Sequence, residues 1–300
     1  MGKAGQRTDM RVMPLAADSL GVRSMATYVE AGGLRLLIDP GATLAPRRYG
    51  LGPAPEEEEA LARARLRIEA YAIRATHVAV SHFHADHALA DPVLYVGRSV
   101  WAMDPRRLLD RHQAAQGREF WRAIGPHCRL VPAEGHETEL DDVTVRFSPP
   151  LPHGLDGSEF GHVVVTTVDD GTRFVHASDL QGPASPVATA YLQRERPDLV
   201  YLSGPPTYLQ GQVGPDVVQR AIDNLVRLVG ETGCRVIVDH HAVREPRFRE
   251  RLAKVFDTGR VVTAAEYVGR RDECLEARRA ALWARRRRGR PDTHEAAGGP

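Results

Sequence analysis

The sequence predicts an α/β protein in which two β-sheets lie between outer helices. β-rich runs precede helical patterns in both halves of the chain, as expected when each sheet buries one face under helices. The 300 residues are enough for one large domain or two small ones, and 42% hydrophobic with 26% charged residues is ordinary for a globular protein. The order of the elements along the chain supports this class.

The first third of the chain predicts a small sheet and a long helix. Residues 11–16 are short and apolar, and residues 24–38 hold two β-rich runs joined by a Gly-Gly turn. A loop rich in proline and glycine follows at 41–55. Residues 56–75 begin acidic and end basic, which a helix dipole favours. The predicted apolar stripe of this helix is Leu61, Ala64, Leu66, Ile68 and Ala72.

The rest of the chain predicts alternating strands and helices, with a strong hairpin signal at Asp170-Gly171. The expected order is a strand at 76–82, a short helix at 91–97, a strand at 99–104, an exposed helix at 104–123, strands between 128 and 180, a strand at 198–204, a helix at 215–231, a strand at 234–241, a helix at 245–257 and a strand at 259–269. A charged helix begins near 271, and we expect a disordered tail from about residue 288.

Composition and charge exclude several protein classes. The formal net charge of +1 gives no global attraction to nucleic acid or membrane. No apolar run approaches the ~20 residues of a membrane span, and the first residues lack the apolar stretch of a secretory signal. Cys128, Cys234 and Cys274 are far apart and form no metal or disulfide pattern, so reduced thiols are expected. The expected location is cytoplasmic.

A cluster of histidines follows the predicted buried strand at 76–82. The stretch HFHADH brings His82, His84, Asp86 and His87 into six positions. Alternating residues of an extended segment point to the same side, so His82 and His84 can bind one ion together. A turn after them would let Asp86 and His87 face an adjacent second metal. Imidazole and carboxylate are ligands for zinc, iron and manganese, and burying four such groups without a metal would leave polar atoms without partners. The cluster therefore predicts a metal site.

HFHADH resembles the signature of the metallo-β-lactamase superfamily. The superfamily pattern places an Asp before this motif and a His, an Asp and a last His after it, each behind a strand. Here Asp39, His153, Asp179 and His240 follow β-rich runs in that order. The segments SLGVRSMATYVEAGGLRLLIDPG and SGPPTYL also resemble a group of uncharacterised, largely archaeal predicted metal-dependent hydrolases.

The resemblance implies the fold class α/β, with the four-layer αββα metallo-β-lactamase sandwich. The fold domain would span residues 10–270, with a helix-bearing insertion at 41–75, and residues 271–300 would form a charged helix and a disordered C-terminal tail. By the same resemblance, His82, His84 and His153 hold one metal and Asp86, His87 and His240 hold a second, with Asp179 between them. Asp86 would also relay a proton, and Asp39 would brace a ligand through hydrogen bonds.

Some assignments stay open at this point. The last ligand is His240 or its neighbour His241. The resemblance favours His240, because superfamily members usually place this ligand directly after the strand. His153 is preferred over His162 because a loop carries a site more often than the interior of a strand. Thr207 and Tyr208, in a Pro-Pro turn after a strand, are candidates for contact with substrate.

The implied function is that of a dinuclear metal-dependent hydrolase that uses a metal-bound hydroxide. A phosphodiester substrate is favoured, with nucleic acid as a weakly supported variant because no broad basic stripe is present. The first alternative is hydrolysis of a small ester, lactone or thioester. The second is an iron-dependent oxidoreductase or a non-catalytic binding protein of the same fold. The expected cofactors are two divalent metal ions, with zinc preferred over iron or manganese, and a homodimer without membrane contact is the expected assembly.

Overall fold

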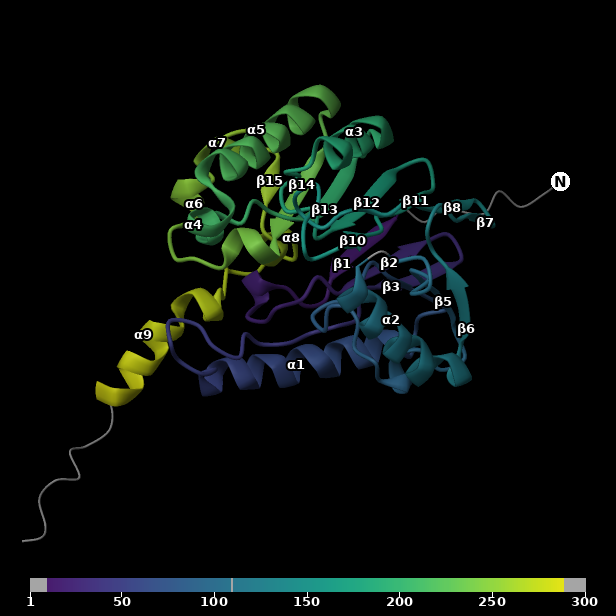
Figure 1. The fold of residues 1–300 in the computed structure, drawn as a ribbon, viewed down its shortest axis with the longest axis horizontal. Coiled ribbons are helices and arrows are strands. Elements are labelled where there is room, and N and C mark those ends of the chain that lie inside the picture. The colour runs from purple at the N-terminus through teal and green to yellow at the C-terminus, as the bar shows by residue number, and fades with distance from the viewer. Residues whose placement is uncertain (1–9, 109, 289–300) are drawn as a thin grey trace, which may run out of the picture.

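Two β-sheets face each other and helices cover both outer faces of the pair (Figure 1). The structure, a computed structural model, describes residues 10–108 and 110–288. The predicted four-layer αββα sandwich is therefore confirmed. The tail expected to be disordered from about residue 288 lies, at 289–300, outside the described residues.

The first sheet comes from the N-terminal half of the chain. Within the described residues its strands are, in spatial order, β1 (Arg11–Pro14), β2 (Thr27–Ala31), β3 (Leu34–Ile38), β4 (His77–Val80), β5 (Ser99–Ala102) and β6 (Arg129–Pro132). β2 and β3 form the predicted hairpin. From β3 to β6 the strands are parallel, so their carboxyl ends lie at one edge.

The second sheet comes from residues 137–262. Its spatial order in the described chain is β15 (Val261–Val262), β14 (Arg235–Asp239), β13 (Leu199–Ser203), β12 (Arg173–Ser178), β11 (Thr166–Asp169), β8 (Val143–Phe147) and β7 (Glu137–Leu140). β12 to β15 are parallel, and β11 and β12 form the hairpin predicted from Asp170-Gly171. A two-stranded ribbon of β9 (Leu151–Pro152) and β10 (His162–Val163) stands apart.

Helices form the outer layers (Figure 1). Beside the first sheet lie α1 (Pro55–Ala72) and α2 (Arg111–Ile124), and beside the second lie α3 (Pro186–Glu195), α5 (Pro215–Thr232), α6 (Phe248–Arg251) and α7 (Ala253–Phe256). Shorter helical segments are α4 (Gln210–Val213), α8 (Ala264–Tyr267), η1 (Asp18–Leu20), η2 (Pro92–Leu94), η3 (Gly125–His127), η4 (Thr207–Leu209) and η5 (His240–Val243), and α9 (Leu275–Arg288) ends the described chain. No helix among the described residues is long and apolar enough to cross a membrane.

The parallel strands β12, β13 and β14 of the second sheet are buried on both faces because their side chains alternate between two cores. Phe174, Tyr201 and Ile237 belong to the core between the sheets, whereas Val200 and Val236 belong to the core under the outer helices. This period of two explains why these strands read as continuous apolar runs in the sequence.

The apolar stripe of α1 differs from the prediction at one position. Ala64, Ile68 and Ala72 are buried, as expected, but Leu66 is 66% exposed. Ala60 takes its place, because residues four apart lie on the same helix face and Leu66 is turned away from that face.

Two predicted elements near the C-terminus are wrong. The strand expected at 259–269 is only β15, because Thr263 accepts a hydrogen bond from the Glu266 backbone N and Glu266 in turn accepts one from the Thr263 N, which starts α8. The helix expected at 245–257 is divided into α6 and α7 at Leu252, whose backbone leaves the helical region while its side chain is fully buried.

Two other helices differ from the expectation, one in its bounds and one because no helix was expected there. The helix predicted to be exposed from residue 104 begins only at Arg111, after Asp110 accepts a hydrogen bond from the Gln113 backbone N. It is not exposed on all sides, because Phe120 and Ile124 are buried against the core. Helix α3, with Ser185 as its N-cap and Pro186 at its first position, was not predicted.

Candidate metal centre

The predicted site residues meet at the edge where the parallel strands of both sheets end. Asp39 follows β3, His82 comes shortly after β4, Asp179 follows β12 and His240 follows β14. The carboxyl ends of parallel strands lie at one edge of a sheet, and ligands of open α/β sheets bind there. The sandwich thereby brings together residues that are up to about two hundred positions apart in sequence.

Three of these strand ends share an unusual backbone. Asp39, Ser178 and His240 have φ angles of 48°, 44° and 57°, in the left-handed region that L-residues rarely occupy. Such a conformation costs on the order of 1–3 kcal/mol and persists where the surroundings enforce it, characteristically at functional sites. At these three positions the chain turns sharply from a strand into the loop that carries site residues.

The first group of candidate ligands consists of His82, His84, His153 and Asp179, whose donor atoms all lie within 4.8 Å of one another. His82 Nε2 is 3.0 Å from His84 Nδ1, and His153 Nε2 is 3.1 Å from Asp179 Oδ2. His153 comes from the loop after β9, so the ribbon of β9 and β10 closes this side of the centre.

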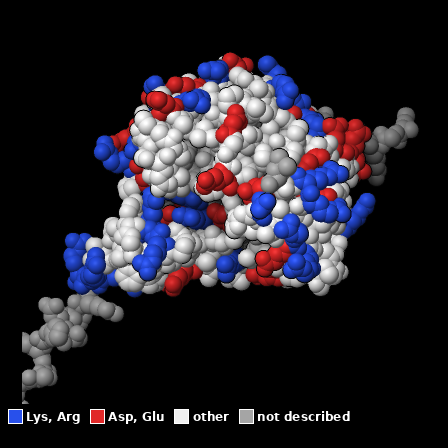
Figure 2. Space-filling view, viewed as in Figure 1, with Lys and Arg blue, Asp and Glu red and all other residues white. Residues whose placement is uncertain are grey.

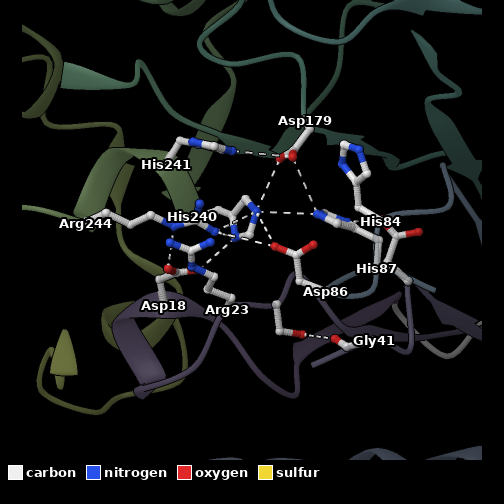
Figure 3. A network of polar contacts seen from close by, with 12 residues as sticks. Asp18, Arg23, Gly41, His84, Asp86, His87, Asp179, His240, His241 and Arg244 are labelled. Carbon is white, nitrogen blue, oxygen red and sulfur yellow. Dashed lines mark hydrogen bonds and ion pairs between the residues drawn. The ribbon is translucent and has the colours of Figure 1, made fainter. Parts of the chain in front are cut away.

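The second group consists of Asp86, His87 and His240, again within 4.8 Å. His240 Nε2 is 3.4 Å from His87 Nε2 and 3.5 Å from Asp86 Oδ2. Asp179 belongs to the first group but also reaches the second: its Oδ1 is 3.5 Å from His240 Nε2 and its Oδ2 is 3.6 Å from His87 Nε2. Figure 3 shows Asp179 and Asp86 directed toward each other, with His87 and His240 around them.

Each histidine of the second group is held from behind by a carboxylate. Asp39 Oδ2 lies 2.9 Å from His87 Nδ1, and Asp18 Oδ2 lies 2.7 Å from His240 Nδ1. A carboxylate at Nδ1 fixes the ring so that Nε2 faces the centre of the site, the usual arrangement behind metal-bound histidines. Asp39 is itself fixed by hydrogen bonds from the Ser81 backbone N and the Ser81 hydroxyl, both at 2.7 Å.

Burial and neighbouring charges act in opposite directions on the pKa of each carboxyl group, and the charges prevail. Burial alone would raise the pKa of Asp86, but the charges of His87, His240 and Arg244 outweigh it and hold that pKa at about 2. Burial would likewise raise the pKa of Asp179, but the charges of His240, His87 and His241 outweigh it and lower that pKa well below its usual value. Both carboxyl groups are therefore ionised, which is the form that binds cations.

The histidines divide into two kinds. Burial and neighbouring histidines lower the pKa of His84 to about 4 and that of His82 far below its usual value, so both rings are neutral. Burial would also lower the pKa of His87, but Asp179 and Asp39 outweigh it and raise that pKa well above the usual value. The carboxylates of the site thus attract positive charge, which a bound cation would satisfy.

Two buried atoms of the candidate ligands further support a fit to divalent metal ions. The buried atoms His153 Nε2 and Asp179 Oδ1 lie 3.1 Å from Asp179 Oδ2 and 3.5 Å from His240 Nε2, but neither makes a well-directed hydrogen bond among the described residues. Buried polar atoms are nearly always partnered, by protein, water or an ion. Both atoms belong to the candidate ligand groups, and imidazole nitrogen with carboxylate oxygen suits zinc, iron or manganese.

His241 and Tyr208 form a pair beside the second group. His241 Nε2 lies 3.5 Å from Asp179 Oδ2, while its Nδ1 is hydrogen-bonded to the Tyr208 hydroxyl at 2.9 Å. His241 can join Asp179 and His240 in a third set of candidate ligands, but only His240 is grouped with Asp86 and His87. Thr207 donates its hydroxyl to Glu245.

The rival histidines lie elsewhere. His162 is in β10, and His176 is buried in β12 with its Nε2 3.1 Å from the Met25 carbonyl. His77 stacks on Trp101. The place of His162 in a strand agrees with the preference for His153 as the ligand.

Two residues of the site were missed from the sequence. Asp18 supports His240, and Arg244 donates from Nε to Asp18 Oδ1 at 2.8 Å while its Nη2 lies 3.0 Å from the His240 ring nitrogens. Asp18 is a single charge in the apolar stretch PLAADSLG, and Arg244 follows the HH pair by three residues. An isolated charge in an otherwise buried segment was the available signal, since such a charge needs a partner.

The chain is similar to archaeal proteins over nearly its whole length. It is 40% identical over 293 residues to a "UPF0282 protein" of Thermococcus gammatolerans, covering 93% of this chain and 96% of that protein. It is 35% identical over 284 residues to the corresponding protein of Methanocaldococcus jannaschii, covering 90% and 95%. No family model matches the chain. The relatives confirm the resemblance to a largely archaeal group.

Solved structures with a similar fold come from proteins of different activities. One is an isothiocyanate hydrolase from Delia radicum gut bacteria (TM-score 0.48, 14% identity, covering 81% of this chain and 94% of that one). Another is a diphosphatase of the PhnP family (TM-score 0.44, 13% identity, 77% and 87%). A third is a subclass B3 metallo-β-lactamase from a soil metagenome (TM-score 0.39, 16% identity, 74% and 96%).

Proposed function

The chain belongs to the UPF0282 family, and we propose that it carries out metal-dependent hydrolysis at the centre described above, with a phosphodiester as the favoured substrate. The observation that supports the proposal most strongly is the convergence of two ligand groups on Asp179. We assign to one metal the ligands His82, His84 and His153, to the other Asp86, His87 and His240, and to both Asp179.

Two divalent ions held in this way would supply a deprotonated water near neutral pH and would polarise the bond under attack. The chain's own residues position this chemistry. Asp18 and Asp39 fix the rings of His240 and His87, and Asp86, which is only 17% exposed at its side chain, is placed to accept and pass on a proton.

Arginines beside the centre favour a negatively charged substrate over a neutral ester or lactone. Arg48 and Arg251 line a groove next to Tyr208, whereas an apolar, closed pocket would be expected for a small neutral ester. Helix α1 of the insertion lies on the outer face of the first sheet, so the loop before it is the part that reaches this groove. Zinc is the proposed metal, and a cytoplasmic homodimer remains the expected form.

The test is turnover of chromogenic substrates by protein loaded with zinc or manganese. We expect hydrolysis of bis(p-nitrophenyl) phosphate to exceed that of p-nitrophenyl acetate, and we expect Asp179→Asn to abolish it. Asp104→Asn is the matched control, since Asp104 is equally buried and pairs with Arg106 away from the centre. Preferred hydrolysis of the acetate would overturn the phosphodiester assignment, and oxygen uptake by an iron-loaded protein would move the proposal to redox chemistry.

A further inference from the structure

A groove of about 600 Å³ lies beside the metal centre, lined by Arg48, Tyr49, Thr207, Tyr208, Glu245 and Arg251 among other residues. The face drawn in Figure 2 is hollowed between the region of α4 and α1, and basic side chains, with some acidic ones between them, lie in and around this hollow. A second cavity of about 430 Å³ shares Thr207, Glu245 and Arg251 with the groove.

The groove is connected to the metal centre by direct contacts. The Tyr208 hydroxyl is hydrogen-bonded to His241 Nδ1 at 2.9 Å, and His241 Nε2 lies 3.5 Å from Asp179 Oδ2. The ring of Tyr208 lies parallel to that of His241, at an interplanar angle of 13°. A substrate bound to Asp179's metals would therefore extend naturally along Tyr208 into the groove.

The walls of the groove carry an excess of positive charge. The one acidic residue among the six wall residues named above, Glu245, is already engaged by the Thr207 hydroxyl and by Arg251 Nε at 3.4 Å. Arg48 is less closely paired: the carboxylate oxygen near it, Glu276 Oε1, lies 3.9 Å from its buried Nε and already accepts a hydrogen bond from Arg23, while Arg48 Nη1 makes no hydrogen bond among the described residues. A fixed guanidinium with an unused donor is suited to a phosphate oxygen.

Arg48 is held in place before any ligand arrives. Its Nη2 donates to the Arg244 carbonyl at 2.7 Å, and its guanidinium carbon lies 4.7 Å from the centre of the Tyr208 ring and 4.9 Å from that of Tyr49. Tyr49 is 49% exposed, so part of an aromatic surface remains free at the mouth of the groove. Such a surface is able to stack against a planar ring.

From these observations we propose that the groove binds a nucleoside phosphate portion of the substrate, with its phosphate on Arg48 and its base against the tyrosines. The volume exceeds what a bare anion needs and lies in the range of pockets for small organic ligands. This inference deepens the proposed function and rests on it for the identity of the groove as a substrate site. It predicts a nucleotide phosphodiester rather than a simple dialkyl phosphate as the substrate class.

The test is equilibrium binding by calorimetry, which requires no turnover. Adenosine 5′-monophosphate, adenosine and inorganic phosphate are titrated separately into the full-length protein as purified. We expect the monophosphate to bind at least about tenfold more tightly than either of the other two, and Arg48→Met to weaken it by about tenfold or more. Arg63→Met, a change at an exposed arginine of α1, is the matched control and should bind like the wild type.

Other outcomes would overturn the inference. Equal binding by the wild type and Arg48→Met would place the phosphate elsewhere, equal affinity for inorganic phosphate would remove the base from the assignment, and no binding of the monophosphate would remove the site. If Arg48→Met does not fold, Arg48→Lys keeps the charge but loses the planar donor fork and should still weaken binding. Binding that depends on Arg48 in a protein that hydrolyses no phosphodiester would disprove the proposed function and leave the nucleotide site standing.

Discussion

Asp179 is the residue on which the two ligand groups depend, because its carboxylate lies within 4 Å of histidines from both. The sequence indicated this residue and the other ligands because each stands directly behind a β-rich run, and HFHADH packs four of them into one segment. It could not indicate that Asp18 and Arg244 support His240. Those two residues are more than two hundred positions apart and meet only when η1 contacts η5.

The choice between His240 and His241 as ligand can be decided by metal analysis. His240 faces Asp86 and His87, whereas His241 is tied to Tyr208. We expect His240→Gln to lower the metal content from about two ions per chain to about one, and His241→Gln to keep both. Elemental analysis of the two purified variants makes the comparison, and the reverse pattern would assign the ligand to His241.

The carboxylate behind His240 should matter for metal affinity although it touches no metal. Asp18→Asn removes the charge that holds both His240 and Arg244, and burial makes that charge hard to replace. We expect about 10- to 100-fold weaker binding of one of the two ions, measured by competition with a chromogenic chelator. Asp104→Asn removes a buried, arginine-paired carboxylate outside the centre, and an equal loss in that variant would refute the supporting role of Asp18.

At the scale of the elements, the loop after β3 packs tightly against the loop that carries HFHADH. A Cβ atom on Gly41 would lie 2.6 Å from the backbone N and C of His87. At that distance one of the two backbone segments would have to move. Only glycine fits where two backbones approach so closely. The sequence placed Gly41 at the start of a loop rich in proline and glycine, but the requirement for glycine at this position comes from this contact.

Gly41→Ala should therefore disturb the centre by displacing His87. We expect metal content to fall and the free energy of unfolding to drop by about 1–3 kcal/mol, as for other overpacked positions. Gly52→Ala is the matched control, because a Cβ there meets nothing within 4 Å. Elemental analysis and urea unfolding of the pair make the comparison, and an unchanged metal content in Gly41→Ala would contradict the predicted clash.

The charged C-terminal helix is anchored by a buried ion pair that its sequence did not reveal. Arg279 is fully buried and donates to both carboxylate oxygens of Glu57, at the start of α1, at 2.8 Å each. Removing one partner of a buried pair typically costs about 3–5 kcal/mol, and we expect Arg279→Met to lose that much in urea unfolding. Arg278→Met, at the exposed neighbour, should change stability by less than about 0.5 kcal/mol, and similar losses in both variants would show that the helix end is not held by this pair.

At the scale of the molecule, the sequence predicted the layers better than the ends of the elements. Alternation of strands and helices and the apolar runs were enough to predict two sheets with outer helices, because burial on both faces leaves a clear pattern. The stretch between β14 and α9 was predicted poorly. There Thr263 and Leu252 decide the outcome through a cap and a buried side chain, and such local effects are not visible as periodicity.

The measurement that tests the central claim most directly is the number of metal ions per chain in protein purified without added metal. We predict about two divalent ions in the wild type, about one in His84→Ala and fewer than one in Asp179→Ala, because Asp179 is shared by both ligand groups. A wild type that binds no metal even after reconstitution, or an Asp179→Ala variant that retains both ions, would contradict a dinuclear centre built around Asp179.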